Sequence, residues 1–126
     1  MMTMTNTIYQ ITYQLAWQQH PSIPKGRVAT LVPGQEGVTP VVALVELPAG
    51  ISAEPHWHER ADDVLYILRG AGKIWIENQG EVSLHEGCFL RIPAGVLHCP
   101  REIREALTIY NLWLPAGAPT EKDETQ

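Results

Sequence analysis

Apolar and polar positions alternate along much of the chain, and this alternation predicts short β-strands. In residues 9–17 the odd positions are apolar or aromatic and the even positions are Gln, Thr or Ala. Because successive side chains of a strand point to opposite faces, the pattern predicts a half-buried strand. Similar strand-like runs follow at residues 27–32, 38–47, 63–70, 72–78, 81–85, 88–92 and 105–114.

Gly, Pro and Asn separate these runs, so that a new strand begins about every 8 to 12 residues, the spacing of an all-β sandwich or barrel. Residues 101–107 could instead form a short helical turn. A chain of 126 residues is expected to fold as one domain. We expect a flexible N-terminus at residues 1–7, a β-barrel domain at 8–114 and a flexible C-terminal tail at 115–126.

Composition narrows the functional classes. The chain is 44% hydrophobic and 18% charged, as in ordinary globular proteins, which argues against overall disorder. A net charge of −5 without a Lys/Arg cluster argues against nucleic acid and anionic membranes as partners. We find no apolar run near the ~20 residues of a membrane span, no signal peptide and too few cysteines for a disulfide framework. By elimination, we expect a cytoplasmic protein.

A pair of histidines one residue apart carries the strongest chemical signal. His56 and His58 stand at positions i and i+2, and on a strand such side chains point to the same face. Two imidazoles placed in this way can ligate one cation, with further ligands from other strands. A third histidine, His98, follows forty residues later, beside a Pro-Ala-Gly turn.

These histidines belong to two spaced motifs that resemble those of the cupin family. The first motif has a glycine, His-x-His, an acid and a second glycine; the second has a glycine, Pro-x-Gly and a histidine. In this chain the positions are Gly50, His56, His58, Asp63 and Gly70, then Gly87, Pro93, Gly95 and His98. Sixteen residues separate the two motifs, as in small microbial cupins. Nine matching positions are far more specific than a His-x-His pair alone.

The resemblance implies a double-stranded β-helix, which is a jelly-roll barrel. It also implies one divalent metal ion per chain (Fe, Mn, Ni or Zn) held by His56, His58, Asp63 and His98. The family's acid is usually Glu, and Asp is shorter by one methylene group. Asp63 therefore either binds the ion directly or orients a ligand imidazole.

Such a ligand set leaves open positions on the metal, which is typical of catalytic sites. The sequence therefore favours a small metalloenzyme of dioxygenase, isomerase, decarboxylase or lyase type, acting on a small anionic or carbonyl-bearing metabolite. The alternative is a non-catalytic small-molecule or metal-binding cupin that serves as a sensor or accessory module. Because residues 105–114 are apolar on both faces, we also expect a homodimer built on residues 9–17 and 105–114.

Several other residues with reactive or aromatic side chains are expected to have no role in the metal site. The parity of its strand places His85 on the outside, and the Pro-rich loop of residues 18–26 predicts an exposed His20. Cys99 should point away from the metal as a buried apolar side chain. We interpret Trp113 as a packing residue and Arg91 as a solvated or salt-bridged cation, although Arg91 could also hold an anionic substrate.

Overall fold

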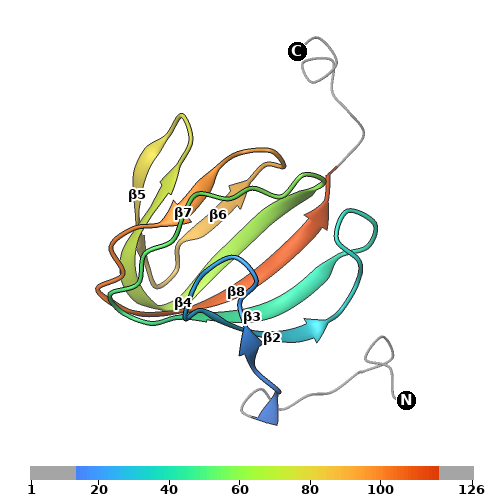
Figure 1. Ribbon diagram of the computed structural model, residues 1–126, viewed down its shortest axis with the longest axis horizontal. Coiled ribbons are helices and arrows are strands. Elements are labelled where there is room, and N and C mark those ends of the chain that lie inside the picture. Colours follow the sequence, from blue (N-terminus) through green and yellow to red (C-terminus); the bar gives the residue numbers. More distant parts are fainter. Residues whose placement is uncertain (1–13, 117–126) are drawn as a thin grey trace.

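Eight antiparallel strands connected by loops make up the computed structural model, which describes residues 14–116 (Figure 1). The strands are β1 Gln18–Gln19, β2 Arg27–Val32, β3 Val41–Leu47, β4 Ala61–Ile76, β5 Gly80–His85, β6 Phe89–Ile92, β7 His98–Pro100 and β8 Glu105–Pro115. The described part of the chain contains no α-helix, which confirms the prediction of an all-β fold. It follows that no helix within residues 14–116 could cross a membrane.

The strands form two walls that share the long strand β4. The first wall has the order β1-β2-β3-β8-β4, and β6 pairs with the first half of β4 on its other edge. The second half of β4 pairs with β5 and β7. Figure 1 shows β2, β3 and β8 along one side and β5 and β7 along the other. This arrangement is the predicted jelly roll, with its interior between the walls.

Strand β4 replaces two strands that the sequence analysis predicted separately, at 63–70 and 72–78. The pairing of β4 with β8 shifts register between Ile67 and Ala71, so the strand bends without breaking. Gly70 permits this bend, because its φ is 104° and a Cβ there would lie 2.2 Å from the backbone oxygen of Ala106. The two glycines near residue 70 therefore mark a bend and not a turn between strands.

Some segments differ from the predicted secondary structure. Residues 14–17, the described end of the strand predicted at 9–17, are not in a strand, and residues 9–13 lie outside the described residues. Residues 101–107 form no helical turn but a loop and the start of β8. The sequence analysis also missed the three-residue strand β7.

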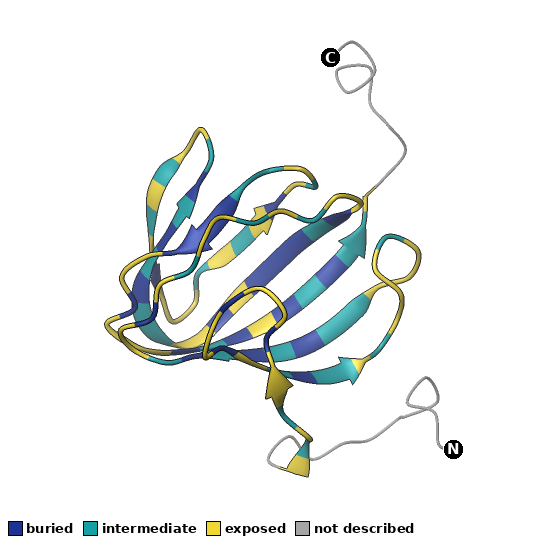
Figure 2. Cartoon of the chain, viewed as in Figure 1, coloured by how far each residue is buried: buried dark blue, intermediate teal, exposed yellow. Residues whose placement is uncertain are grey.

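Alternation along β8 shows how the walls enclose the core. Its buried side chains are Leu107, Ile109, Asn111 and Trp113, whereas Tyr110 between them is 38% exposed. Figure 2 shows the same alternation of dark and light segments along β8 and its neighbours. Three of the four buried side chains pack into the single apolar cluster between the walls, and the fourth is the polar Asn111.

Candidate metal centre

Backbone hydrogen bonds join the two motifs at one end of the barrel interior. His56 and His98 exchange both backbone hydrogen bonds, each 3.0 Å long, as an isolated antiparallel bridge. Residues paired in this way carry their side chains on the same face. Gly95, at a φ of 85°, donates its N–H to the backbone oxygen of His58 over 2.8 Å. The Pro-Ala-Gly turn is thus attached to the segment that carries the histidine pair.

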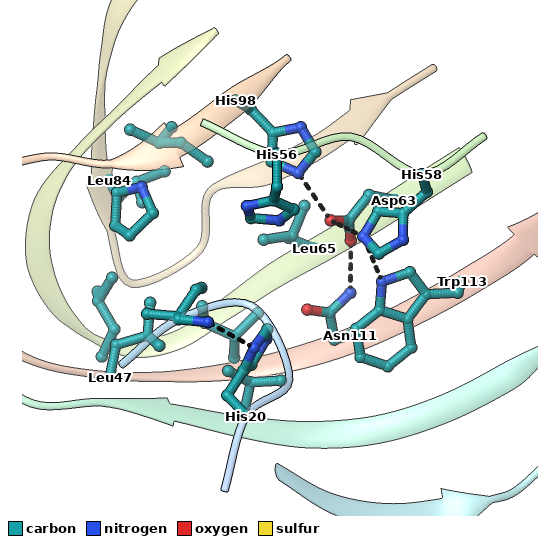
Figure 3. Close-up of a pocket in the computed structure, with 16 residues that line it drawn as sticks. His20, Leu47, His56, His58, Asp63, Leu65, Leu84, His98, Asn111 and Trp113 are labelled. Atoms are coloured by element: carbon teal, nitrogen blue, oxygen red, sulfur yellow. Dashed lines mark hydrogen bonds and ion pairs between the residues drawn. The ribbon is translucent and has the colours of Figure 1, made fainter. Parts of the chain in front are cut away.

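This pairing gathers the four predicted side chains. Each of His56, His58, Asp63 and His98 offers one ligand atom, and these atoms all lie within 4.8 Å of one another. Figure 3 shows the three imidazoles converging on the Asp63 carboxylate, which projects from β4. A cluster of three imidazoles and one carboxylate at these separations is capable of holding a metal ion.

Asn111 on β8 holds the carboxylate in place. Its side-chain nitrogen donates to Asp63 Oδ1 over 2.7 Å and to the backbone oxygen of Val64 over 3.0 Å. Asp63 Oδ2 remains directed at the imidazoles, 3.1 Å from His98 Nε2 and 3.6 Å from His58 Nε2. The sequence analysis missed Asn111. The available signal was a polar residue at an inward-facing position of an otherwise apolar strand.

The tautomer of His98 indicates that a cation fits the cluster. His98 Nδ1 lies 2.9 Å from the backbone oxygen of Val96, which can only accept, so Nδ1 carries a proton. In the neutral ring, Nε2 then presents a lone pair to Asp63 Oδ2 at 3.1 Å. Two facing acceptors require a second proton or a cation between them. A histidine that donates its remote N–H to a backbone carbonyl is also the usual arrangement of metal ligands.

His56 shows the same need for a partner. Its Nδ1 is buried without a hydrogen-bond partner among residues 14–116. Burial, together with the neighbouring His98 and His58, lowers the pKa of His56 from 6.5 to about 4 against the opposing charge of Asp63. The ring is therefore neutral at pH 7. A neutral imidazole with an unpaired buried nitrogen suits a metal ligand.

His58 has competing partners. Burial disfavours its protonation, but contact with Asp63 and the nearby Glu36 outweighs burial and raises its pKa. Glu36 Oε1 lies 3.4 Å from Nδ1, on the side away from the cluster. On the cluster side, Trp113 Nε1 donates to Nε2 over 3.2 Å. An ion bound at Nε2 would compete with this indole for the lone pair.

The charge state of Asp63 is set by these same neighbours. Burial alone would raise its pKa, but the contacts with His58 and His98 and the hydrogen bond from Asn111 outweigh burial and hold the pKa well below the usual range. The side chain is only 5% exposed and remains a carboxylate at neutral pH. It supplies the negative charge that favours a divalent cation beside the imidazoles.

A narrow cavity of about 30 Å³ extends from the cluster into the barrel (Figure 3). Most of its lining is aliphatic. Its polar lining residues beyond the cluster are Asn111 and His20. His20 was predicted to be exposed, and this prediction is wrong: the side chain is 7% exposed, because the loop between β1 and β2 folds inward over the cavity. Trp113 is buried as predicted, and it also lines the cavity.

Three other candidates lie away from the cavity, as expected. His85 is exposed on β5, and Cys99 is fully buried, with its sulfur accepting from Arg101 Nε over 3.3 Å. Arg91 forms a salt bridge of 2.8 Å with Asp62 and does not line the cavity. Its salt-bridged interpretation is therefore confirmed, and the anionic-substrate role is not supported.

Comparison with known proteins identifies the family. The cupin domain profile matches residues 43–113, which include all four cluster residues, and the chain therefore belongs to the cupin family. Among curated proteins, quercetin 2,3-dioxygenase of Bacillus subtilis is 34% identical over 61 residues. That match covers 48% of this chain but only 18% of the dioxygenase.

Solved structures agree on the fold. An RmlC-like cupin from Shewanella frigidimarina has a TM-score of 0.73 at 15% identity, covering 90% of this chain and 96% of its own. A predicted oxalate decarboxylase from Thermotoga maritima has a TM-score of 0.70 at 18% identity, and the match covers 86% of this chain and 99% of the other. The cupin domain of Cnp3 from Schizosaccharomyces pombe has a TM-score of 0.70 at 17% identity, and the match covers 86% of this chain and 74% of that domain's chain. At these identities, the likeness establishes the jelly-roll fold alone.

Proposed function

We propose that this protein binds one divalent metal ion through His56, His58, Asp63 and His98, and that it is a small metalloenzyme. The observation that carries the proposal is the contact of His98 Nε2 with Asp63 Oδ2, 3.1 Å apart, two atoms that are both acceptors when the ring is neutral. The hydrogen bond of His98 Nδ1 to Val96 and that of Asn111 to Asp63 preorient both atoms. We propose Fe, Mn, Ni or Zn as the ion, because imidazole-rich sites accept all four.

A bound ion of this kind would polarise an oxygen of a small anionic or carbonyl-bearing metabolite and stabilise the negative charge that develops on it. The chain's own residues prepare that chemistry. Asn111 fixes the carboxylate, and most of the cavity wall is aliphatic. The reaction would be of dioxygenase, isomerase, decarboxylase or lyase type. The limited similarity to quercetin 2,3-dioxygenase favours testing oxygenation first.

Metal titration tests the site. We expect the protein to bind about one Co(II) per chain, with visible absorption bands typical of nitrogen and oxygen ligands, and to release it to Zn(II). Because the imidazoles must be deprotonated to bind, the affinity should fall below the ordinary histidine pKa of about 6.5. A protein that binds none of Co(II), Mn(II), Fe(II), Ni(II) or Zn(II) would rule out the site.

One observation favours the alternative, a non-catalytic ligand-binding cupin. Apart from the cluster, His20 is the only titratable residue that lines the cavity within residues 14–116, and burial lowers its pKa to about 4. It therefore has no readily released proton at pH 7. Oxygen uptake by the Fe(II)-loaded or Mn(II)-loaded protein with quercetin distinguishes the two functions: catalysed loss of quercetin supports an oxygenase, whereas binding without turnover supports the alternative.

We also propose a homodimer. On the outer face of the first wall, Phe89, Tyr66 and Tyr110 occupy one cross-strand row of three strands, and they are 65%, 42% and 38% exposed. Large apolar side chains grouped in this way are typical of interaction surfaces. Light scattering should give about 28 kDa, twice the chain mass of 14.1 kDa. A value near 14 kDa at micromolar concentration would contradict the dimer. The barrel boundaries at 8–114 and the cytoplasmic location stay predictions.

A further inference from the structure

The loop between β2 and β3 brings a second carboxylate to the histidines, and the metal cluster does not include it. Glu36 stands on this loop, and its Oε1 lies 3.4 Å from His58 Nδ1. Within residues 14–116, His58 is the only residue with which Glu36 forms an ion pair. Glu36 precedes both sequence motifs, so neither motif could indicate it. Its contact with a candidate ligand therefore calls for a separate explanation.

Backbone hydrogen bonds and a packing contact fix the place of Glu36. The N–H of Thr39 donates to the backbone oxygen of Gln35 over 2.8 Å, and the N–H of Gln35 donates to that of Thr39 over 3.3 Å, which closes the loop around Glu36. The next residue, Gly37, lies against Arg60, because a Cβ on this glycine would be 3.0 Å from the Arg60 Cβ. Arg60 follows the histidine pair by two residues. The loop is therefore held against the segment that carries the pair.

The tautomer of His58 directs a proton at this carboxylate. An indole N–H can only donate, so the contact of 3.2 Å between Trp113 Nε1 and His58 Nε2 makes Nε2 the acceptor. Figure 3 shows this nitrogen turned toward Trp113 and Asp63. The ring then carries its proton on Nδ1, which faces Glu36. The nitrogen that could bind an ion and the nitrogen beside Glu36 are thus different atoms of one ring, and the two contacts do not compete.

The charges around the ring favour the same arrangement. Asp63 is the only carboxylate of the cluster, so a divalent ion held there with neutral imidazoles would keep one positive charge uncompensated. Glu36 supplies a second negative charge from the far side of His58. A carboxylate that accepts the remote N–H of a ligand imidazole also raises the basicity of the ring and fixes its orientation. Because the Glu36 side chain is 50% exposed, water weakens this effect without abolishing it.

We infer that Glu36 is a positioning residue of the metal site, which holds His58 by its Nδ1–H and keeps Nε2 directed at the ion. The inference rests on the proposed metal site and adds to it a residue that neither belongs to the cluster nor lines the cavity. His98 is held in a similar way by a backbone carbonyl, that of Val96. His58 differs because its partner is charged and comes from a loop, so that the β2–β3 loop becomes part of the metal site.

Competition titration with Zn(II) of two variants at position 36 tests this role. In Glu36→Ala, the Zn(II) affinity should fall by about ten-fold, the lower end of the range for residues that orient ligands, because the carboxylate is half exposed. Glu36→Gln keeps an oxygen that can accept the Nδ1–H but removes the charge. It should lose only about three-fold, because a neutral hydrogen bond is about half as strong as one to a charged group.

Glu59→Gln is the matched control for the loss of a negative charge near the site. Glu59 directly follows His58 in the chain and is exposed. In the part of the chain that the structure describes, it forms no ion pair with the His58 ring. Its charge acts only through water, so this variant should keep the Zn(II) affinity of the wild type to within about two-fold. Circular dichroism confirms that all three variants fold.

Proton NMR of the Zn(II) form gives a readout that a purely structural role of the loop would not change. We expect the His58 Nδ1–H to appear as a downfield signal that exchanges slowly with water, and to move upfield and exchange faster in Glu36→Ala but not in Glu59→Gln.

Three results would overturn this inference alone: wild-type Zn(II) affinity in Glu36→Ala, a loss no larger than that of Glu59→Gln, or a loss that Glu36→Gln does not reduce. A wild-type protein that binds no Zn(II) would overturn the proposed metal site, and this inference with it.

Discussion

The two ends of the cavity are built in different ways. At one end, strand pairing fixes the cluster: the His56–His98 bridge and the β4–β8 register bring histidines, Asp63 and Asn111 together. At the other end, a loop closed by its own backbone hydrogen bonds holds His20. The cluster end is polar and suited to a cation, whereas the loop end offers a single neutral donor among aliphatic side chains.

This difference separates the residues that could bind the ion from those that only line the cavity. A change at the cluster end should alter metal binding strongly, because it removes an ion ligand. A change at the loop end should leave the ion in place, because His20 is not part of the cluster. Variants at each end can therefore be compared by the same metal titration. If variants at both ends change the metal affinity equally, the proposed difference between the ends is wrong.

The largest effect should come from His98→Ala. It removes one of three imidazoles, so metal affinity should fall by well over the ~10- to 100-fold that is typical of changes beyond the direct ligands. Competition titration with Zn(II) measures the loss, and circular dichroism confirms that the barrel still folds. His85→Ala is the control, because this exposed histidine on β5 lies outside the cluster. If His85→Ala weakens binding more than His98→Ala, the motif assignment itself is wrong.

The loop end should contribute to the dependence of stability on pH. Burial lowers the pKa of His20 from 6.5 to about 4, so between these values the unfolded chain binds a proton that the folded chain does not. The free energy of unfolding should therefore fall as pH falls from 6.5 to 4, and the pKa difference corresponds to about 3 kcal/mol from His20. His56 acts in the same direction, whereas the raised pKa of His58 acts in the opposite one.

Urea denaturation of metal-free protein at pH 7 and at pH 4.5 measures this dependence. The His20→Asn variant should lose less stability between the two conditions than the wild type, while His85→Asn should behave as the wild type does. An unchanged pH dependence in His20→Asn would show that the imidazole is not held neutral by the loop.

Sequence reasoning predicted the cluster end well, for physical reasons. His56 and His58 are visible because side chains at i and i+2 share a face, and the spacing to Asp63 and His98 follows the family motif. Most strands were predicted because one of their faces is buried, which leaves an alternating pattern. Strand β4 was divided in two because Gly70 and Gly72 usually mark turns, and only the tertiary pairing shows a bend.

The loop end could not be predicted in the same way. Residues 18–26 have no periodicity, and their two prolines suggested an exposed loop. What places His20 inside is a long-range contact, the packing of Ile23 into the core, together with backbone hydrogen bonds to the ring. Such contacts leave no pattern along the chain. An isolated isoleucine in a Pro-rich loop was the only local signal.

A smaller effect is expected for Asn111→Ala, which tests whether the cluster is preoriented. The change leaves Asp63 Oδ1 without its donor, so the carboxylate should lose its fixed orientation. We expect metal affinity to fall by ~10-fold, within the range for residues that orient ligands, and the free energy of unfolding to fall by about 1–3 kcal/mol. Zn(II) titration and urea denaturation measure the two. A loss as large as that of His98→Ala would mean that Asn111 does more than orient the carboxylate.

The smallest effect should be a gain in affinity, and it lies at the cluster end, beside His58. Trp113 Nε1 donates to His58 Nε2, the same atom that an ion would need. Trp113→Phe keeps an aromatic ring in the wall but removes this competing donor, so Zn(II) affinity should rise by up to about five-fold, the worth of one hydrogen bond. Trp75→Phe, which changes a tryptophan that does not line the cavity, should leave the affinity unchanged. A marked loss of affinity in Trp113→Phe would instead mean that the indole supports His58 as a ligand, and that the hydrogen bond helps to build the metal site.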